Sequence, residues 1–267
     1  MKDKRILYVS SEVVPYLPEN EVSQMSFDTP KMINDLGGQI RIFMPRYGSI
    51  NERRHQLHEV IRLSGMNLVI NDMDMPLIIK VASIPKERIQ VYFIDNDDYF
   101  KRKNTFVDEH NVLYEDNDER AIFFTKGVIE TVKKLNWVPD VIHVQGWLAS
   151  MLPLYMKKYY NDETIFADTK IVTSVFAKPF EEKISQDMHS KVAFDGFKPE
   201  DIEVLKEATF ENIMKNAIDF SDGVIVSSEN ITPDLTKYIE TSGKPFLPFT
   251  SKEEMKEVLT DFYRNKL

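Results

Sequence analysis

The chain has 267 residues, 42% of them hydrophobic and 29% charged, with a formal net charge of -9. These values fit a globular protein that buries a substantial core, and the acidic balance argues against nucleic-acid binding, which needs clustered Lys and Arg. Cysteine is absent, which excludes disulfides and thiolate metal sites and favours a reducing compartment, so we expect a cytoplasmic protein.

Short β-branched runs recur along the chain and predict strands at residues 5–10, 39–45, 89–95, 140–145, 170–176 and 222–228. The runs are apolar throughout, which is typical of a parallel sheet covered on both faces. Residues 60–84 are also strand-rich, and we expect an antiparallel extension or hairpin there. No apolar run approaches the roughly 20 residues that cross a bilayer, so no membrane association is expected.

Segments with helical periodicity lie between these runs. The first helix is predicted at residues 30–36, with Asp28 or Thr29 as N-cap and Pro30 at the first helical position. Apolar residues at helical spacing predict further helices at residues 118–135 and 199–220. The last helix is expected at residues 251–265, where Ser251 and Glu254 have the spacing of a capping box.

The alternation of strands and helices predicts an α/β fold, a Rossmann-like doubly wound and mainly parallel sheet with helices on both faces. Residues 1–239 are expected to form the domain. Residues 240–267 are expected to form a linker and a C-terminal helix that pack on the same domain.

Familiar catalytic motifs are absent: the sequence has no GxGxxG, GxxxxGK[ST], HExxH or GxSxG. We therefore expect no cofactor and no metal. The acidic run "EDNDER" (residues 115–120) lacks the glycine and regular oxygen spacing of a calcium loop, and we favour a helix start, where carboxylates suit the helix dipole. "DNDD" (residues 95–98) is interpreted as a turn, with a catalytic carboxylate pair as the alternative.

The histidines do not indicate a metal site. His55 and His58 are three residues apart, but we interpret their segment as solvated. His143 is flanked by Ile142 and Val144 in a predicted strand, which favours a packed, hydrogen-bonded core histidine.

The loop after the first strand, residues 15–24, contains two prolines and two glutamates but no glycine or lysine. In parallel α/β folds this loop commonly binds phosphate through free backbone N–H groups. The loop therefore occupies the position of a phosphate-binding loop but lacks residues that attract an anion.

Six segments, in order and at similar spacing, resemble the N-terminal domain of bacterial glycogen synthase and plant starch synthase. They are "YVSSEVVPY" from Tyr8, "RIFMPRYGSI" from Arg41, "VYFIDN" from Val91, "YEDNDERAIFF" from Tyr114, "WVPDVIHVQGW" from Trp137 and "DFSDGVIVSS" from Asp219. The resemblance implies half of a two-Rossmann-domain glycosyltransferase. Such enzymes are retaining and move glucose from ADP-glucose to an α-1,4-glucan in the cleft between the domains. The chain is expected to end where the second, nucleotide-binding domain would begin.

The resemblance also implies active-site positions, and most carry other residues here. The family's Lys-Thr-Gly-Gly-Leu loop corresponds to Pro18, Glu19, Asn20, Glu21 and Val22. Its His-Asp-Trp-His motif corresponds to Gln145, Gly146, Trp147 and Leu148, and its His-Asn pair to Phe176 and Ala177. These replacements remove polar groups of the kind that transition-state stabilisation requires, so no catalytic residue is assigned.

Four residues match the family at strand ends expected to face the cleft: Glu12, Arg46, Tyr47 and Trp147. Arg46 and Trp147 suit a glucan, because guanidinium groups and aromatic faces bind sugars. Packing and salt bridges would explain the presence of these four residues equally well.

Three hypotheses follow. We favour a catalytically degenerate domain that acts as a binding or regulatory module for a glucan or a protein partner. The alternatives are a subunit of a split ADP-glucose:α-1,4-glucan glucosyltransferase completed by a second chain, and an enzyme of changed chemistry with Glu12, Glu19 or Glu21 as acid or base. The cleft face is expected to be covered by the last helix or by a homodimer.

Overall fold

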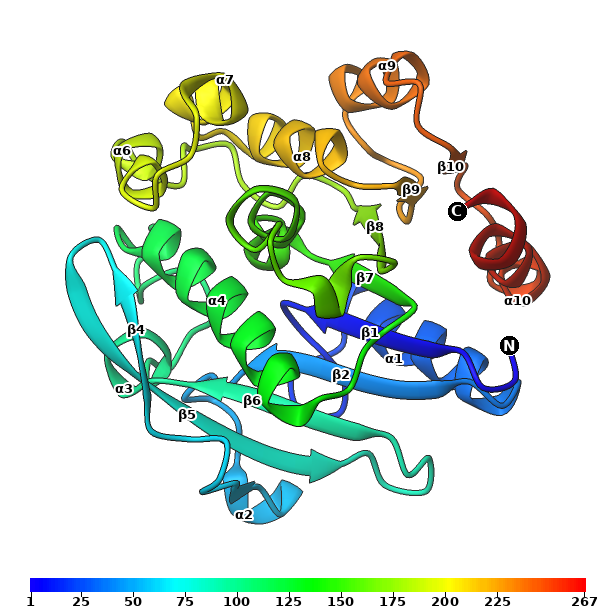
Figure 1. Ribbon diagram of the computed structural model, residues 1–267, viewed down its shortest axis with the longest axis horizontal. Helices are drawn as coiled ribbons and strands as arrows, with labels where there is room; N and C mark the ends of the chain where they lie inside the picture. Colours follow the sequence, from blue (N-terminus) through cyan, green and yellow to red (C-terminus); the bar gives the residue numbers. More distant parts are fainter.

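The computed structural model describes all residues from Met1 to Leu267 and contains one central sheet (Figure 1). The strand order is β10-β9-β8-β7-β1-β2-β6-β5-β3, and β4 pairs with β5. The strands are β1 (Arg5–Ser10), β2 (Gln39–Pro45), β3 (His58–Glu59), β4 (Met66–Ile70), β5 (Met73–Ser83), β6 (Gln90–Asp95), β7 (Val141–Gln145), β8 (Lys170–Val175), β9 (Gly223–Val226) and β10 (Phe246–Leu247).

The sheet is mainly parallel, as predicted. All pairs from β10 to β6 are parallel, whereas β3, β4 and β5 pair antiparallel. The strand-rich segment at residues 60–84 therefore forms the expected hairpin, with β4 and β5 as its arms.

Helices cover both faces of this sheet, which confirms the predicted doubly wound α/β architecture. Helix α1 packs against β1 and β2, whereas α4 crosses β2 and β6 on the opposite face (Figure 1). None of the helices combines the length and apolarity needed to cross a bilayer.

The α-helices are α1 (Glu21–Asp35), α2 (Glu52–His55), α3 (Asp97–Phe100), α4 (Asn117–Leu135), α5 (Leu152–Leu154), α6 (Met188–Ala193), α7 (Pro199–Ile202), α8 (Phe210–Asp219), α9 (Pro233–Thr241) and α10 (Lys252–Asp261). Short 3-10 or π segments are η1 (Trp147–Ala149), η2 (Tyr155–Tyr159), η3 (Thr164–Phe166), η4 (Glu203–Lys206) and η5 (Phe262–Lys266).

The strand order reverses between β1 and β7. From β1 the chain continues to β2 on one side, whereas β7, β8, β9 and β10 follow one another on the other side. Connections that leave neighbouring strands in opposite directions open a crevice at their carboxyl ends, where α/β proteins bind ligands. The residues after β1 and β7 are therefore the place to look for a site.

The first helix begins at Glu21, so the prediction of a start at Pro30 is wrong. Asn20 and Ser23 form a reciprocal capping box: Asn20 Oδ1 accepts from the Ser23 N–H and Ser23 Oγ from the Asn20 N–H, both at 2.8 Å. Pro30 lies buried inside the helix. A strong cap upstream thus overrides the helix-start signal of the proline.

Two other helix predictions are corrected. The helix predicted at residues 199–220 is divided into α7, η4 and α8, because Thr209 starts a new helix by accepting a hydrogen bond from the Asn212 N–H. The capping box predicted for Ser251 and Glu254 does not form, since Ser251 Oγ bonds the Glu254 side chain instead of the backbone. Helix α4 does begin within the acidic run, at Asn117.

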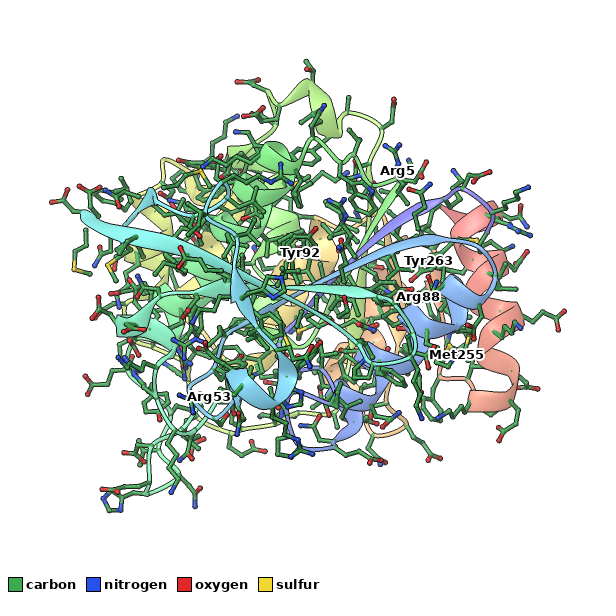
Figure 2. All side chains as sticks on the ribbon, turned by 90° about the horizontal axis from the view of Figure 1, so that it is seen from below. Arg5, Arg53, Arg88, Tyr92, Met255 and Tyr263 are labelled. Carbon is green, nitrogen blue, oxygen red and sulfur yellow. The ribbon has the colours of Figure 1, made fainter.

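The C-terminal segment, α10 and η5, contacts α1 and reaches the sheet through Tyr263; Figure 2 labels Met255 and Tyr263 on it. The Tyr263 hydroxyl lies 2.6 Å from Nδ1 of His143 and 3.2 Å from the Tyr8 hydroxyl. His143 Nε2 lies 2.7 Å from Ser174 Oγ, and burial lowers the pKa of His143 to about 3. His143 is therefore a neutral, hydrogen-bonded core residue, as predicted.

We predict that Tyr263→Phe lowers the free energy of unfolding by about 1–3 kcal/mol, because His143 Nδ1 is left buried without a partner. Urea denaturation followed by circular dichroism measures the change. Tyr159→Phe is the matched control, since that side chain is 44% exposed, and a change within about 0.5 kcal/mol is expected. Equal effects of the two substitutions would refute a structural role for the hydrogen bonds between Tyr263 and His143.

Candidate functional site

The crevice between β1 and β7 holds a cavity of only about 50 Å³. It is lined by Ser11, Glu12, Val22, Phe106, Gly146, Trp147, Ser174, Phe176, Ala177, Pro179, Phe210 and Met214. Small-molecule sites usually measure about 300–1,000 Å³. The cavity is therefore too small for a sugar nucleotide.

Aromatic side chains fill the space. The ring centroid of Trp147 lies 4.9 Å from that of Phe106 and 5.3 Å from that of Phe180, and Phe180 in turn packs on Phe210 at 5.9 Å. We call these four residues, with Phe176, the aromatic plug. Because Trp147 is only 5% exposed, its face is not available to stack on a sugar.

Gly146 brings β7 into close contact with β1. Its φ is +83°, and a Cβ built there would lie 1.8 Å from Ser11 Oγ. The family resemblance assigns an aspartate to this position. With this backbone no side chain fits, so the glycine at this position also determines the shape of the crevice.

The neighbours of Gly146 and Trp147 belong to the core. Gln145 accepts a hydrogen bond from Ser10 Oγ at 3.0 Å and donates one to Thr29 Oγ1 at 3.2 Å, tying β1 and β7 to α1. Leu148 is fully buried. These two side chains, at positions where the resemblance implies histidines, hold the fold together and do not line the cavity.

The loop before α1 is closed by its own hydrogen bonds. Pro18, Glu19, Asn20 and Glu21 are all exposed and none of them lines the cavity. The Pro18 carbonyl accepts from Ser23 Oγ at 2.9 Å, while Glu21 places a negative charge in the first helical turn. An anion is therefore disfavoured where a helix N-terminus would otherwise attract one.

Glu12 is the one carboxyl group in the cavity. Its Oε1 accepts from Asn20 Nδ2 at 2.9 Å, and burial raises its pKa, an effect that the Asn20 hydrogen bond partly opposes. Ser11 Oγ and Trp147 Nε1 are buried there without hydrogen-bond partners. The cavity thus holds one carboxyl group and two unpartnered polar groups, Ser11 Oγ and Trp147 Nε1, with no room for a second reactant.

Arg46 and Tyr47 lie outside the cavity. Arg46 Nε donates to Asp95 Oδ1 at 2.9 Å and its Nη2 donates to Asp97 Oδ1 at 3.1 Å, so its guanidinium is committed to a salt-bridge network. The Tyr47 hydroxyl donates to the Ser11 carbonyl at 2.9 Å. Of the four residues that the resemblance assigns to the cleft, the structure therefore brings only Glu12 and Trp147 together in the crevice. Tyr47 contacts it through the Ser11 carbonyl, and Arg46 does not line it.

Several lining residues were not predicted from the sequence. Phe106 comes from the long connection between β6 and α4, whereas Phe210 and Met214 come from α8. Each of these connections follows a strand of the parallel sheet. Their position after a parallel strand is the only feature of the sequence that could have predicted these three lining residues, because no motif links residues so far apart.

Comparisons with known proteins agree with this fold. A family model described as the starch synthase catalytic domain matches residues 5–243. The glycogen synthase of Chlorobium limicola is 40% identical over 172 residues, which are 64% of this chain and 35% of that protein. The glycogen synthase of Chlorobaculum parvum is 31% identical over 246 residues, 90% of this chain and 49% of that protein.

One solved structure is similar in fold. The catalytic domain of Starch Synthase IV from Arabidopsis thaliana, bound to ADP and acarbose, superposes with a TM-score of 0.75 at 14% identity. The match covers 94% of this chain and 52% of that one. The chain spans about half or less of the length of the relatives it matches.

Gly146→Ala is expected to destabilise the fold strongly. Gly146 has φ 83° and ψ 151°, a conformation that is essentially restricted to glycine and costs other residues about 1–3 kcal/mol, and displacing Ser11 adds about 1–3 kcal/mol. Gly196→Ala is the matched control, because Gly196 has φ +82° but open space around it. Chemical denaturation of both variants measures the difference, and equal losses would show that the contact with Ser11 carries no cost.

Glu12→Gln is expected to stabilise the protein at pH 7 and to lose this advantage in acid. Because burial raises the pKa of Glu12, the folded chain favours the protonated form, so ionisation costs stability as the pH rises above the ordinary value of 4.5. A glutamine keeps the acceptor for Asn20 without the charge. Unfolding free energies at several pH values test this, with Glu19→Gln as a control for the loss of one charge; a constant difference between Glu12→Gln and the parent would contradict it.

Proposed function

The chain belongs to the starch synthase catalytic domain family, and we propose that it is a catalytically degenerate member that acts as a binding or regulatory module. The observation that carries this proposal is the filled crevice, where the aromatic plug leaves a cavity of about 50 Å³. Two substrates that meet in a reaction need far more room.

The chemistry of the lining supports the same conclusion. Phe176 has no group that can hydrogen-bond a sugar hydroxyl, and Gly146 supplies no carboxylate. Removal of a single well-placed donor commonly slows catalysis by about 10²–10³-fold. Here the lysine loop, the aspartate and the histidine that the resemblance implies all have other residues in their place. Several groups that would stabilise a transition state are therefore missing together.

The partner would be a glucan or another protein, and it would contact the outside of the crevice. The buried faces of Trp147 and Phe176 are not accessible to it. The loops at the carboxyl ends of the strands form the outer surface around the crevice. We therefore propose these loops as the contact area for the partner. A second copy of the chain is one protein that could bind there.

Glu12 favours one second candidate, an enzyme of changed chemistry. A buried carboxyl group with a raised pKa is a typical general acid. Glu19 and Glu21, the other acids considered for this role, are exposed and lie outside the cavity. Any such reaction would need the aromatic plug to open.

Glucosyl transfer is the direct test. The purified chain, incubated with radiolabelled ADP-glucose and glycogen, is expected to incorporate no label above the protein-free blank, and Phe176→His is expected to remain inactive because one polar group does not reopen the crevice. The Chlorobium limicola glycogen synthase serves as positive control. Incorporation by the chain alone that Glu12→Ala abolishes would overturn the proposal, and incorporation only after addition of a second chain would favour a split enzyme.

A further inference from the structure

Two polar groups in the crevice cavity have no partner within the chain. Ser11 Oγ and Trp147 Nε1 are buried without a hydrogen bond, and both residues line the cavity. Ser11 is only 1% exposed and Trp147 only 5%. A buried polar group without a hydrogen bond costs free energy, and a molecule that supplies the missing bond recovers it. The cavity therefore favours an occupant that forms hydrogen bonds.

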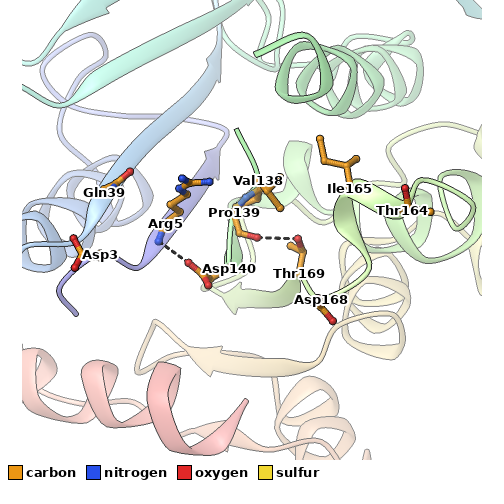
Figure 3. A pocket seen from close by; sticks show the side chains of 10 residues that line it. All are labelled: Asp3, Arg5, Gln39, Val138, Pro139, Asp140, Thr164, Ile165, Asp168 and Thr169. Carbon is orange, nitrogen blue, oxygen red and sulfur yellow. Dashed lines mark hydrogen bonds between the residues drawn. The ribbon is translucent and has the colours of Figure 1, made fainter. Parts of the chain in front are cut away.

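A larger depression at the amino ends of the strands lacks this property (Figure 3). It measures about 620 Å³ and is lined by Arg5 and by Asp3, Asp140 and Asp168, among others. The Asp140 carboxylate already accepts from the Arg5 backbone N–H at 2.8 Å. None of the nine side chains that bury an unpartnered polar atom lines this depression, whereas two of the nine line the crevice cavity. The smaller cavity is therefore the better candidate for a ligand.

The Ser11 hydroxyl lies where Gly146 leaves the cavity wall without a side chain. A Cβ built on Gly146 would be 1.8 Å from Ser11 Oγ and 3.2 Å from Val22 Cγ1. Ser11, Gly146 and Val22 all line the cavity. The glycine thus leaves the Ser11 hydroxyl uncovered on this side.

The size of the cavity limits the ligand. One water needs roughly 10–15 Å³ of such space. The cavity of about 50 Å³ therefore accommodates about three to five groups of that size. A small organic molecule fits within this limit, and a sugar ring with its hydroxyl groups does not.

Most of the cavity wall is apolar, and it reaches the surface. Phe106, Phe176, Phe210 and Met214 line it with carbon atoms only. Pro179, which also lines it, is exposed, and Glu12 and Val22 are half-buried. A ligand can thus enter from the side of the loops and place its own carbon atoms against the aromatic rings.

The polar groups select a neutral ligand. The indole N–H of Trp147 can only donate, so it needs an acceptor and offers nothing to a cation. Glu12 is the one carboxyl group that lines the cavity, and its negative charge would repel an anion. A hydroxyl group both accepts and donates, so it can pair with Trp147 Nε1 and with Ser11 Oγ or Glu12 at the same time.

We propose that the crevice cavity binds a small neutral alcohol of about three to five non-hydrogen atoms. Its hydroxyl oxygen accepts from Trp147 Nε1 and its hydroxyl proton is donated to Ser11 Oγ or to Glu12, while its carbon atoms pack against Phe106 and Phe176. This inference names a ligand class for the proposed binding module, and it rests on that proposed function.

The indole N–H of Trp147 reports directly on the site. The chain has two tryptophans, so a nitrogen–proton correlation NMR spectrum contains two indole peaks, which Trp147→Phe assigns. Titration of the unsubstituted chain with isopropanol is expected to shift the Trp147 peak saturably, with a dissociation constant in the millimolar range. The Trp137 peak, from a residue outside the cavity, is expected to stay in place.

Two charged probes of similar size test the selection for a neutral ligand. Isopropylammonium has the shape of isopropanol with a positive charge, and acetate carries a negative charge. Each is expected to bind about tenfold more weakly than isopropanol or worse, because a charge is costly to bury without a counter-charge. Equal affinities for the three probes would overturn the proposal.

Ser11→Ala is expected to weaken isopropanol binding about threefold to tenfold, because it removes one hydrogen-bonding group from the cavity. Ser26→Ala is the matched control, since the Ser26 hydroxyl is also buried without a partner but does not line the cavity. No change is expected for this control. Equal affinities of the two variants, or no saturable shift of the Trp147 peak at several hundred millimolar isopropanol, would overturn the proposal.

Titration of the same sample with ADP-glucose separates this inference from the proposed function. A saturable shift of the Trp147 peak by micromolar ADP-glucose would contradict the closed crevice and, with it, the proposed function. No shift with either ADP-glucose or isopropanol would overturn the present inference alone, because the crevice would then be closed to both molecules.

Discussion

The close contact between Gly146 and Ser11 sets the shape of the crevice on which the rest of the site depends. With φ at +83° and no side chain, Gly146 lets the end of β7 approach β1 more closely than any other residue would allow. Trp147 follows directly and packs against Phe106 and Phe180. From the other side, the Tyr47 hydroxyl holds the Ser11 carbonyl. The backbone approach and the aromatic plug therefore form one unit.

Electrostatics at the start of α1 reinforce this closure. A free helix N-terminus next to a switch point would attract a phosphate, but the capping box of Asn20 and Ser23 uses the polar groups there. Glu21 adds a negative charge in the first turn, and Glu12 binds Asn20 from the cavity side. A helix start is thus present at the switch point, while its capacity to bind an anion is offset by the chain's own side chains.

Sequence patterns predicted the sheet better than the site. Continuous apolar runs marked the parallel strands, and these place Gly146 and Ser11 at the switch point. The start of α1 was not predicted correctly, because Pro30 gives a strong local signal while the cap formed by Asn20 lies in what resembles a ligand loop. The salt bridge between Arg46 and Asp95 joins distant segments, so no local pattern could indicate that Arg46 is withdrawn from the crevice.

Binding of ADP-glucose tests the central claim, that the crevice is closed, most directly. Calorimetric titration of the unsubstituted chain with ADP-glucose measures it without requiring turnover or an acceptor. The closed crevice predicts no heat beyond that of dilution. A saturable isotherm with a dissociation constant in the micromolar range, weakened by substitution of Glu12, would contradict the account.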